Sequence, residues 1–194
     1  MAILTDPWPH KTVANFLPKE RFEAIKILAA HEQEYLDMFG FYTRSGHYIR
    51  YEPIDILPEI TFDMFSDMPM RSHSGNLKKI IHWSIHPKGF SYPAHIDNES
   101  RISTAVLYIT PKRNKGTILC KNNSPHNPDH GRPSQESEYE VETEWKPNNL
   151  FLHNSINGTT WHRYEASTQR TTLNVFFVEP DKIMPDRIEN RFLL

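Results

Sequence analysis

The chain has 194 residues and a formal net charge of -2, with 22 Lys and Arg residues against 24 Asp and Glu residues. This length suits one domain with a real core, and the balanced charge gives no electrostatic footprint for nucleic acid or for an anionic membrane surface. Cys120 is the only cysteine, so no intrachain disulfide can form. The start of the chain lacks the basic flank and apolar run of a signal peptide, and no stretch is apolar enough to span a bilayer, so we expect a cytoplasmic protein.

The N-terminal part of the chain contains the helices that we expect. A short strand is predicted within residues 11–16, and Pro18 then stands at the first turn of an amphipathic helix over residues 19–39. Apolar residues recur near helical spacing on one side of this helix, namely Phe22, Ile25, Leu28, Ala29, Leu36 and Phe39. Glu32 falls on that apolar side and Ile27 on the polar one, while Gly40 is placed to end the helix.

Strands dominate the rest of the sequence. A strand from His47 and a second short helix with Pro58 at its first turn come first. Short β-rich runs separated by Pro, Gly, Asn or polar clusters then follow from Lys79: KIIHWSIHP, GFSYPAHI, ISTAVLYIT, GTILC, YEVETEW, NLFLHN, TTWHRYE and TTLNVFFVE. Strands at this density without interleaved helices indicate antiparallel pairing, because parallel pairs need long helical crossovers.

We therefore predict a mainly β fold with N-terminal helices, in the form of a double-stranded β-helix, or jelly roll, with helices packed on one sheet. Residues 1–194 would form a single domain, with a helical cover over about residues 1–70 and a jelly-roll core over about residues 79–178. The polar connection over residues 121–138, rich in Pro and Asn, is typical of a mobile lid, a binding loop or a disordered segment.

His95 and Asp97 are the first candidates for chemistry. They lie two residues apart in SYPAHIDNES, so on a strand they point to one face and can bind the same ion. The alternative is a purely structural role, as a polar strand end with a turn-capping aspartate. A tight metal site needs a third ligand, and the strand-borne candidates downstream are His153 and His162. We favour His162, because the arginine that follows it, Arg170, opens an apolar strand.

Arg170 and Thr172 suggest an anion site beside this metal site. An arginine side chain presents a fork that matches a carboxylate, and a hydroxyl on the same strand face can donate a further hydrogen bond. The alternative is a surface salt bridge, which stabilises little. Thr172 and Asn174 share one face of the strand while Leu173 and Val175 share the other. This alternation favours an arginine that points inward.

Two imidazoles and one carboxylate on one face of an octahedron would leave three adjacent positions open on a redox-active iron. A bidentate cosubstrate can take two of them and dioxygen the third. A closed structural zinc site, in which four protein ligands fill a tetrahedron, does not fit this set.

In this order, the residues resemble the Fe(II)- and 2-oxoglutarate-dependent dioxygenases, and among them the prolyl-4-hydroxylase-like branch. WPHKTVANFLPKERFEAI is similar to the opening strand, turn and first helix of that branch, and GFSYPAHIDNESRISTAVLYIT to its His-x-Asp strand and the next strand. TTWHRYEASTQRTTLNVFF resembles the distal histidine, the arginine and the closing strand. The resemblance runs from Trp8 to Val178. The branch usually has a double glycine where this chain has Lys115 and Gly116, and residues 121–138 have no counterpart.

The resemblance implies that His95, Asp97 and His162 bind Fe(II). It implies that Arg170, helped by Thr172, pairs with the distal carboxylate of 2-oxoglutarate.

Two tyrosines are included in the resemblance. Tyr108 matches a position where this branch often places a tyrosine that hydrogen-bonds the cosubstrate, and Tyr92 matches an aromatic residue beside the pocket mouth.

The implied activity is hydroxylation of a prolyl residue, an amino acid or a small metabolite, with dioxygen consumed, succinate and carbon dioxide released, and ascorbate as a candidate reductant. The alternatives are an iron oxygenase with another outcome, such as demethylation, and a non-catalytic jelly-roll module that binds metal or senses a ligand. A halogenase is disfavoured, because Asp97 fills the position that a halide would need. We expect a small-molecule or peptide substrate and no nucleic-acid or membrane partner, and the oligomeric state stays open.

Four other residues invite functional interpretations that we disfavour. His82 and His86 share a strand face, but with no carboxylate beside them a partly buried sheet face is the better interpretation. Cys120 ends an apolar run and is expected to be a small buried residue. His31, in HEQE, lacks the second histidine of the zinc-protease motif, so we expect it on a solvated helix face.

Overall fold

The computed structural model describes residues 2–39, 48–121 and 139–182. Two features of the sequence analysis lie outside these ranges, namely the helix end at Gly40 and nearly all of the connection over residues 121–138. In chain order the elements are β1 (His10–Val13), α1 (Lys19–Phe39), β2 (Tyr48–Glu52), the 3-10 helix η1 (Phe62–Phe65), β3 (Lys78–His86), β4 (Ser91–His95), β5 (Arg101–Thr110), β6 (Thr117–Lys121), β7 (Tyr139–Glu142), β8 (Leu150–Asn154), β9 (His162–Glu165), β10 (Arg170–Val178) and the 3-10 helix η2 (Pro180–Lys182).

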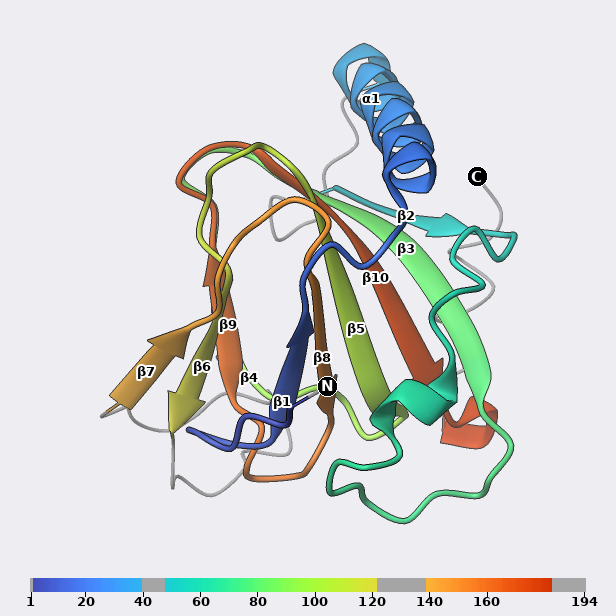
Figure 1. The fold of residues 1–194 in the computed structure, drawn as a ribbon, viewed down its shortest axis with the longest axis vertical. Coiled ribbons are helices and arrows are strands. Elements are labelled where there is room, and N and C mark those ends of the chain that lie inside the picture. Colours follow the sequence, from blue (N-terminus) through green and yellow to red (C-terminus); the bar gives the residue numbers. More distant parts are fainter. Residues whose placement is uncertain (1, 40–47, 122–138, 183–194) are drawn as a thin grey trace.

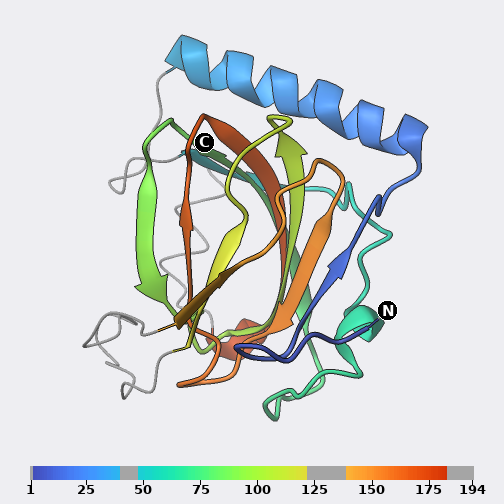
Figure 2. The same cartoon turned by 60° about the vertical axis from the view of Figure 1, so that its left-hand side comes forward.

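Two antiparallel sheets face each other (Figures 1 and 2). The major sheet has six strands in the order β1-β8-β5-β10-β3-β2, and the minor sheet has four in the order β4-β9-β6-β7. The strands predicted after Lys79 are all present, as β3 to β10. The predicted mainly β, jelly-roll class is therefore confirmed, and the major sheet also takes in β1 and β2 from the N-terminal part of the chain.

Helix α1 packs on the outward face of the major sheet, near one end of its strands. Its bounds agree with the prediction, and its buried residues Phe22, Ile25 and Ala29 belong to the main core cluster. The same cluster contains apolar residues of β3, β5 and β10, which are Ile81, Trp83, Ala105, Leu107, Leu173, Val175 and Phe177. Figure 2 shows the helix running across one end of the two facing sheets. Within the described ranges, no helix has the length and apolar character needed to cross a membrane.

Alternation along β10 separates this core from the interior of the jelly roll. Leu173 and Val175 belong to the cluster under α1. Because successive side chains of a strand point to opposite faces, Arg170, Thr172 and Asn174 face the other way, toward the minor sheet. The inward orientation that the sequence predicted for Arg170 agrees with its side chain being 2% exposed.

Glu32 is the polar residue that the sequence places on the apolar side of α1, and it is buried there at 9% exposure. It accepts hydrogen bonds from Tyr48 Oη at 3.1 Å and from Arg50 Nε at 2.6 Å. This pairing ties α1 to β2 and satisfies the buried carboxylate. Leu28, assigned to the apolar side, is 41% exposed, so that assignment was wrong, whereas Ile27 is exposed as expected.

The second helix is shorter than the sequence predicted. Only η1 is helical in the segment after Pro58. Its neighbourhood is a series of tight turns, in which the backbone N–H groups of Ile60, Met64 and Met68 each donate to the carbonyl three residues earlier. Such bonds form 3-10 turns, which rarely continue beyond a few residues.

We predict that Glu32→Ala lowers the free energy of unfolding by about 1–3 kcal/mol, because Tyr48 loses its buried acceptor and Arg50 keeps only its bond to Glu52. The matched control is Glu34→Ala on the same helix, where the side chain is 70% exposed and the change should stay within about 0.5 kcal/mol. Urea denaturation measures both values. Equal losses in the two variants would contradict a structural role for Glu32.

Candidate active site

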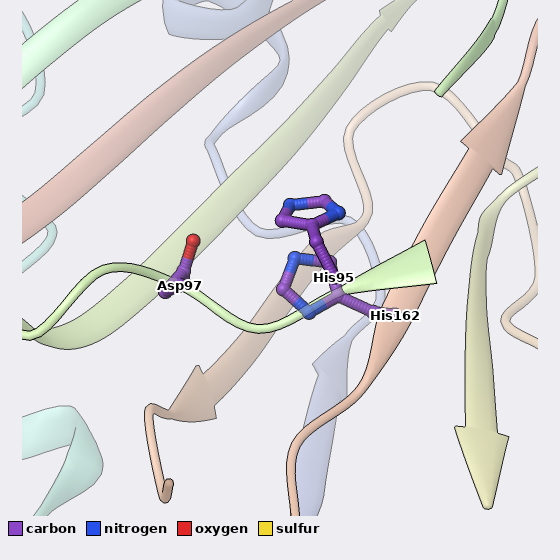
Figure 3. A group of neighbouring side chains, drawn as sticks. All are labelled: His95, Asp97 and His162. Atoms are coloured by element: carbon purple, nitrogen blue, oxygen red, sulfur yellow. The ribbon is translucent and has the colours of Figure 1, made fainter. Parts of the chain in front are cut away.

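His95, Asp97 and His162 form a compact group between the two sheets. One ligand atom from each lies within 4.8 Å of the others. His95 ends β4 and His162 begins β9, and the two residues are direct partners in the pairing of these strands. Asp97 follows β4 by two residues. Figure 3 shows the two imidazole rings close together with the Asp97 carboxylate beside them. The third ligand that the sequence favoured, His162, is thus the one that joins the pair.

Backbone carbonyls fix the orientation of both imidazoles. His95 Nδ1 lies 3.0 Å from the carbonyl oxygen of Pro93, and His162 Nδ1 lies 3.0 Å from that of Thr160. A neutral imidazole that donates from Nδ1 keeps the lone pair of Nε2 for a metal ion. Both rings are therefore oriented so that Nε2 is left for a metal ion.

The Asp97 carboxylate is buried at 5% exposure and held from both sides. Arg101 Nη1 donates to Oδ1 at 2.7 Å, while the hydroxyls of Thr104 and Ser155 donate to Oδ2 at 2.7 and 3.2 Å. Burial alone would raise the pKa of Asp97, but Arg101 and the nearby histidines outweigh it and hold the pKa well below its usual range. Asp97 therefore stays ionised, as a metal ligand must be.

His153 lies beside this group without belonging to it. Its Nε2 is 3.7 Å from Asp97 Oδ2, and its ring centroid is 5.0 Å from that of His162. Trp8 packs against His153 at 5.3 Å between ring centroids. His153 is thus the buried histidine next to the site that the sequence left as the rival ligand.

Arg170 is buried with few polar partners. Its one hydrogen bond within the described residues runs from Nη1 to the carbonyl of Lys115 at 3.3 Å, and Nε has no acceptor there. No carboxylate of those residues lies within salt-bridge distance. The guanidinium instead lies 4.9 Å from the ring centroid of Trp145 and 5.3 Å from that of Tyr164. Desolvation lowers the pKa of Arg170, because burial disfavours the charged guanidinium. A bound anion would stabilise that charge.

Thr172 is the second residue of the predicted anion site, the anion clamp, which consists of Arg170 and Thr172. It follows Arg170 by two residues on the same face of β10, and its side chain is 1% exposed. Its Oγ1 finds no hydrogen-bond partner in the part of the chain that the structure describes. Two neighbouring groups that can donate hydrogen bonds are therefore buried and unsatisfied, and an anion with several acceptor oxygens would satisfy both.

The backbone at Gly116 passes directly against another strand end. A Cβ atom at this position would lie 1.9 Å from the carbonyl oxygen of Thr143, so no other residue fits without moving the chain. This contact gives the physical reason for a glycine at position 116. The preceding Lys115 supplies the carbonyl that Arg170 contacts.

Aromatic side chains lie next to the group of His95, Asp97 and His162. Tyr92 packs edge-on against His95 with ring centroids 4.7 Å apart, which agrees with the predicted place beside the site. Tyr164, its cross-strand partner, stacks on Tyr92 at 5.2 Å with an interplanar angle of 7°. Tyr164 also contacts His86 at 4.7 Å. Tyr164 was not among the site residues predicted from the sequence, although it lies two residues after His162 and so shares its strand face.

Tyr108 is fully buried in the cluster between the sheets, where its ring stacks on Trp145 at 4.6 Å. Its hydroxyl lies 2.9 Å from both Thr117 Oγ1 and Thr143 Oγ1, and it accepts the backbone N–H of Thr117 at 3.0 Å. Trp145 thus contacts both the Tyr108 ring and the Arg170 guanidinium, while the Tyr108 hydroxyl forms hydrogen bonds with neighbouring protein groups.

The residues with disfavoured roles lie as expected. Cys120 is buried, and burial raises the pKa of its thiol to about 12, so it is a poor nucleophile. The His31 side chain is 67% exposed on α1. His82 and His86 are buried rather than partly buried, and they contact Asn174 and Ser84 on the inner face of the major sheet.

No protein-family model matches the chain, and no curated protein sequence matches it. Solved structures do match over most of its length. The chain has the fold of prolyl hydroxylases. A prolyl-4-hydroxylase from Pseudomonas putida matches with a TM-score of 0.58 and 18% identity, covering 88% of this chain and 92% of that one. A prolyl hydroxylase from Trichoplax adhaerens, in complex with a peptide fragment of the hypoxia inducible factor oxygen degradation domain, matches with a TM-score of 0.60 and 14% identity, covering 89% and 84%.

A third match is the viral collagen prolyl hydroxylase of Paramecium bursaria Chlorella virus-1 in its 2OG complex, with a TM-score of 0.57 and 10% identity, covering 90% of this chain and 98% of that one. The three matches confirm the predicted resemblance at the level of the fold.

His95 and His153 make the metal-free protein sensitive to acid. Desolvation lowers the pKa of His153 to about 4 and that of His95 to about 3, from the ordinary value of 6.5. Between the lowered pKa values and the ordinary value of 6.5, the unfolded chain binds more protons than the folded protein. The free energy of unfolding should therefore fall as the pH drops from about 6.5 toward about 4.

Urea denaturation with a chelator present, at several pH values across this window, measures the slope. We expect His153→Phe to flatten it, because one buried neutral histidine is removed, whereas the exposed His31→Ala should leave it unchanged. An identical slope in the His153 variant and the parent protein would contradict the account.

Proposed function

We propose that the protein is an Fe(II)- and 2-oxoglutarate-dependent dioxygenase that hydroxylates its substrate. The observation that carries this proposal is the pairing of two kinds of site: a group of two neutral imidazoles and one carboxylate, and a buried arginine with no carboxylate partner in the described residues. A three-ligand metal site alone fits many proteins. The added anion site fits a cosubstrate that has one end on the metal and a carboxylate at the other end.

The residues present fit Fe(II). His95, Asp97 and His162 would hold it, because two imidazoles and one carboxylate are the donor set that non-haem Fe(II) oxygenases use, with further positions left open. When bound, iron with 2-oxoglutarate and dioxygen supplies oxidation of a C–H bond to C–OH, and 2-oxoglutarate leaves as succinate and carbon dioxide.

The surrounding side chains have distinct tasks in this proposal. Arg101 holds the Asp97 carboxylate by a charge-assisted hydrogen bond, which fixes the direction of the metal ligand. Arg170 and Thr172 bind the far carboxylate of 2-oxoglutarate. Tyr92 forms an aromatic side of the substrate space and helps to exclude water from the reacting centre.

Prolyl residues in peptides are the first substrates to test. The matching solved structures are prolyl hydroxylases, and one of them is in complex with a peptide fragment. A free amino acid or a small metabolite remains within the same proposal, since all three would present a C–H bond to the metal. We further propose that residues 1–194 act as a single domain.

The first test is turnover. Purified protein with Fe(II), ascorbate and 2-oxoglutarate should release succinate, at least slowly without substrate, and prolyl peptides should raise the rate. His95→Ala should abolish the release, because it removes a metal ligand. Tight metal binding with no consumption of 2-oxoglutarate would instead favour a sensing or binding module.

The second test is cosubstrate affinity under anaerobic conditions, where the Fe(II) protein is titrated with 2-oxoglutarate. Arg170→Ala should weaken binding by about tenfold or more, since hydrogen bonds to a charged group contribute about 1.5–3 kcal/mol each. The matched control is Arg163→Ala, because Arg163 lies on the same sheet as the ligands but points outward to Glu140. Equal affinities in the two variants would contradict the cosubstrate assignment.

A further inference from the structure

We propose that Tyr164 is the tyrosine that hydrogen-bonds the 2-oxo acid and that its ring positions Arg170. The resemblance assigned the tyrosine hydrogen bond to the position of Tyr108. This inference rests on the proposed function, and it concerns which residue of this chain recognises the cosubstrate.

The hydrogen-bonding capacity of Tyr108 is already used. A phenol has one hydrogen to donate and two lone pairs to accept with. Thr143 Oγ1 donates its own hydrogen to the carbonyl of Thr117 at 3.0 Å, so its contact with Tyr108 must be one in which it accepts the Tyr108 hydrogen. The backbone N–H and the hydroxyl of Thr117 then occupy the two lone pairs of Tyr108. No donor remains for a ligand.

Tyr164 lies between the anion clamp and the metal ligands. Its ring centroid is 5.3 Å from the Arg170 guanidinium carbon and 6.5 Å from the centroid of the His95 ring. A molecule that reaches from the metal to Arg170 therefore passes along this ring. Because Tyr164 and His162 alternate with the outward-facing Arg163 on β9, both side chains point into the space between the sheets.

The Tyr164 hydroxyl is free to bind a ligand. Among the residues that the structure describes, no group forms a hydrogen bond with it, in contrast to the engaged hydroxyl of Tyr108. A neutral phenol beside Arg170 is a donor suited to an oxygen of the 2-oxo acid.

The ring of Tyr164 has a second effect, on Arg170. The guanidinium contacts the rings of Tyr164 and Trp145, and its one hydrogen bond to the described residues is to a backbone carbonyl. Removal of one ring would leave the arginine side chain with fewer contacts that fix its orientation. Tyr164 is in this sense a positioning residue for the clamp.

The test compares variants by anaerobic titration of the Fe(II) protein with 2-oxoglutarate, and thermal unfolding checks that each variant is folded. Tyr164→Phe should weaken 2-oxoglutarate binding about tenfold, because it removes one hydrogen bond to a charged ligand. Tyr164→Ala should weaken it further, because the ring is lost as well. Metal affinity should change by less than about threefold in both, which a general loss of structure would not allow.

Tyr108→Phe is the contrasting variant. It should lower thermal stability, since buried hydrogen bonds to two threonines are lost, and it should change 2-oxoglutarate affinity by less than about twofold. Weakened binding in Tyr108→Phe together with unchanged binding in Tyr164→Phe would overturn the inference. Equal affinity in the parent protein and Tyr164→Phe would contradict the inference alone. If the parent protein itself fails to bind 2-oxoglutarate, the proposed function has failed.

Discussion

Arg170 carries its positive charge at a position that is 2% exposed, and within the described residues no carboxylate is close enough to form a salt bridge with it. Burial of a charge without a counter-ion is unfavourable, so native proteins rarely keep one unless the charge has a use. Two aromatic rings and one carbonyl compensate for the lost water only in part. An anionic ligand would complete the compensation, and the proposed cosubstrate follows from this single constraint.

The two sheets supply the two parts of the site, namely Arg170 from one sheet and the pair of His95 and His162 from the other. Strand β10 of the major sheet presents Arg170 inward, while the pairing of β4 with β9 in the minor sheet brings His95 next to His162. Tyr164 lies between them, since it is on the same strand as His162 and contacts Arg170 from the opposite sheet. A shift of either strand by one residue would turn its side chains to the other face and dismantle the site.

The sequence predicted the parts of the site that depend on local periodicity. Arg170 and Thr172 are two residues apart within β10, and a strand places such a pair on one face whatever surrounds it. His95 and Asp97 were predicted together on the same ground, but β4 ends at His95, so the turn after the strand places Asp97. His162 was favoured over His153 by a longer-range pattern, because the arginine that follows it, Arg170, opens an apolar strand, and the resemblance then agreed with this choice.

What the sequence could not predict depends on contacts between distant strands. The hydroxyl of Tyr108 is engaged by Thr117 and Thr143, which lie on other segments. Glu32 is tolerated on a buried helix face because Arg50, from the next strand, reaches it. No local pattern reveals such partners, since they meet only when the sheets are assembled.

The central claim is that one site holds a metal ion and a dicarboxylate together. A crystal structure of the protein with Mn(II) in place of Fe(II), grown with 2-oxoglutarate under anaerobic conditions, tests it most directly. The account predicts the metal on His95, Asp97 and His162 and the far carboxylate of 2-oxoglutarate on Arg170. A metal on other ligands, or an Arg170 that stays without the carboxylate while the metal is bound, would contradict it.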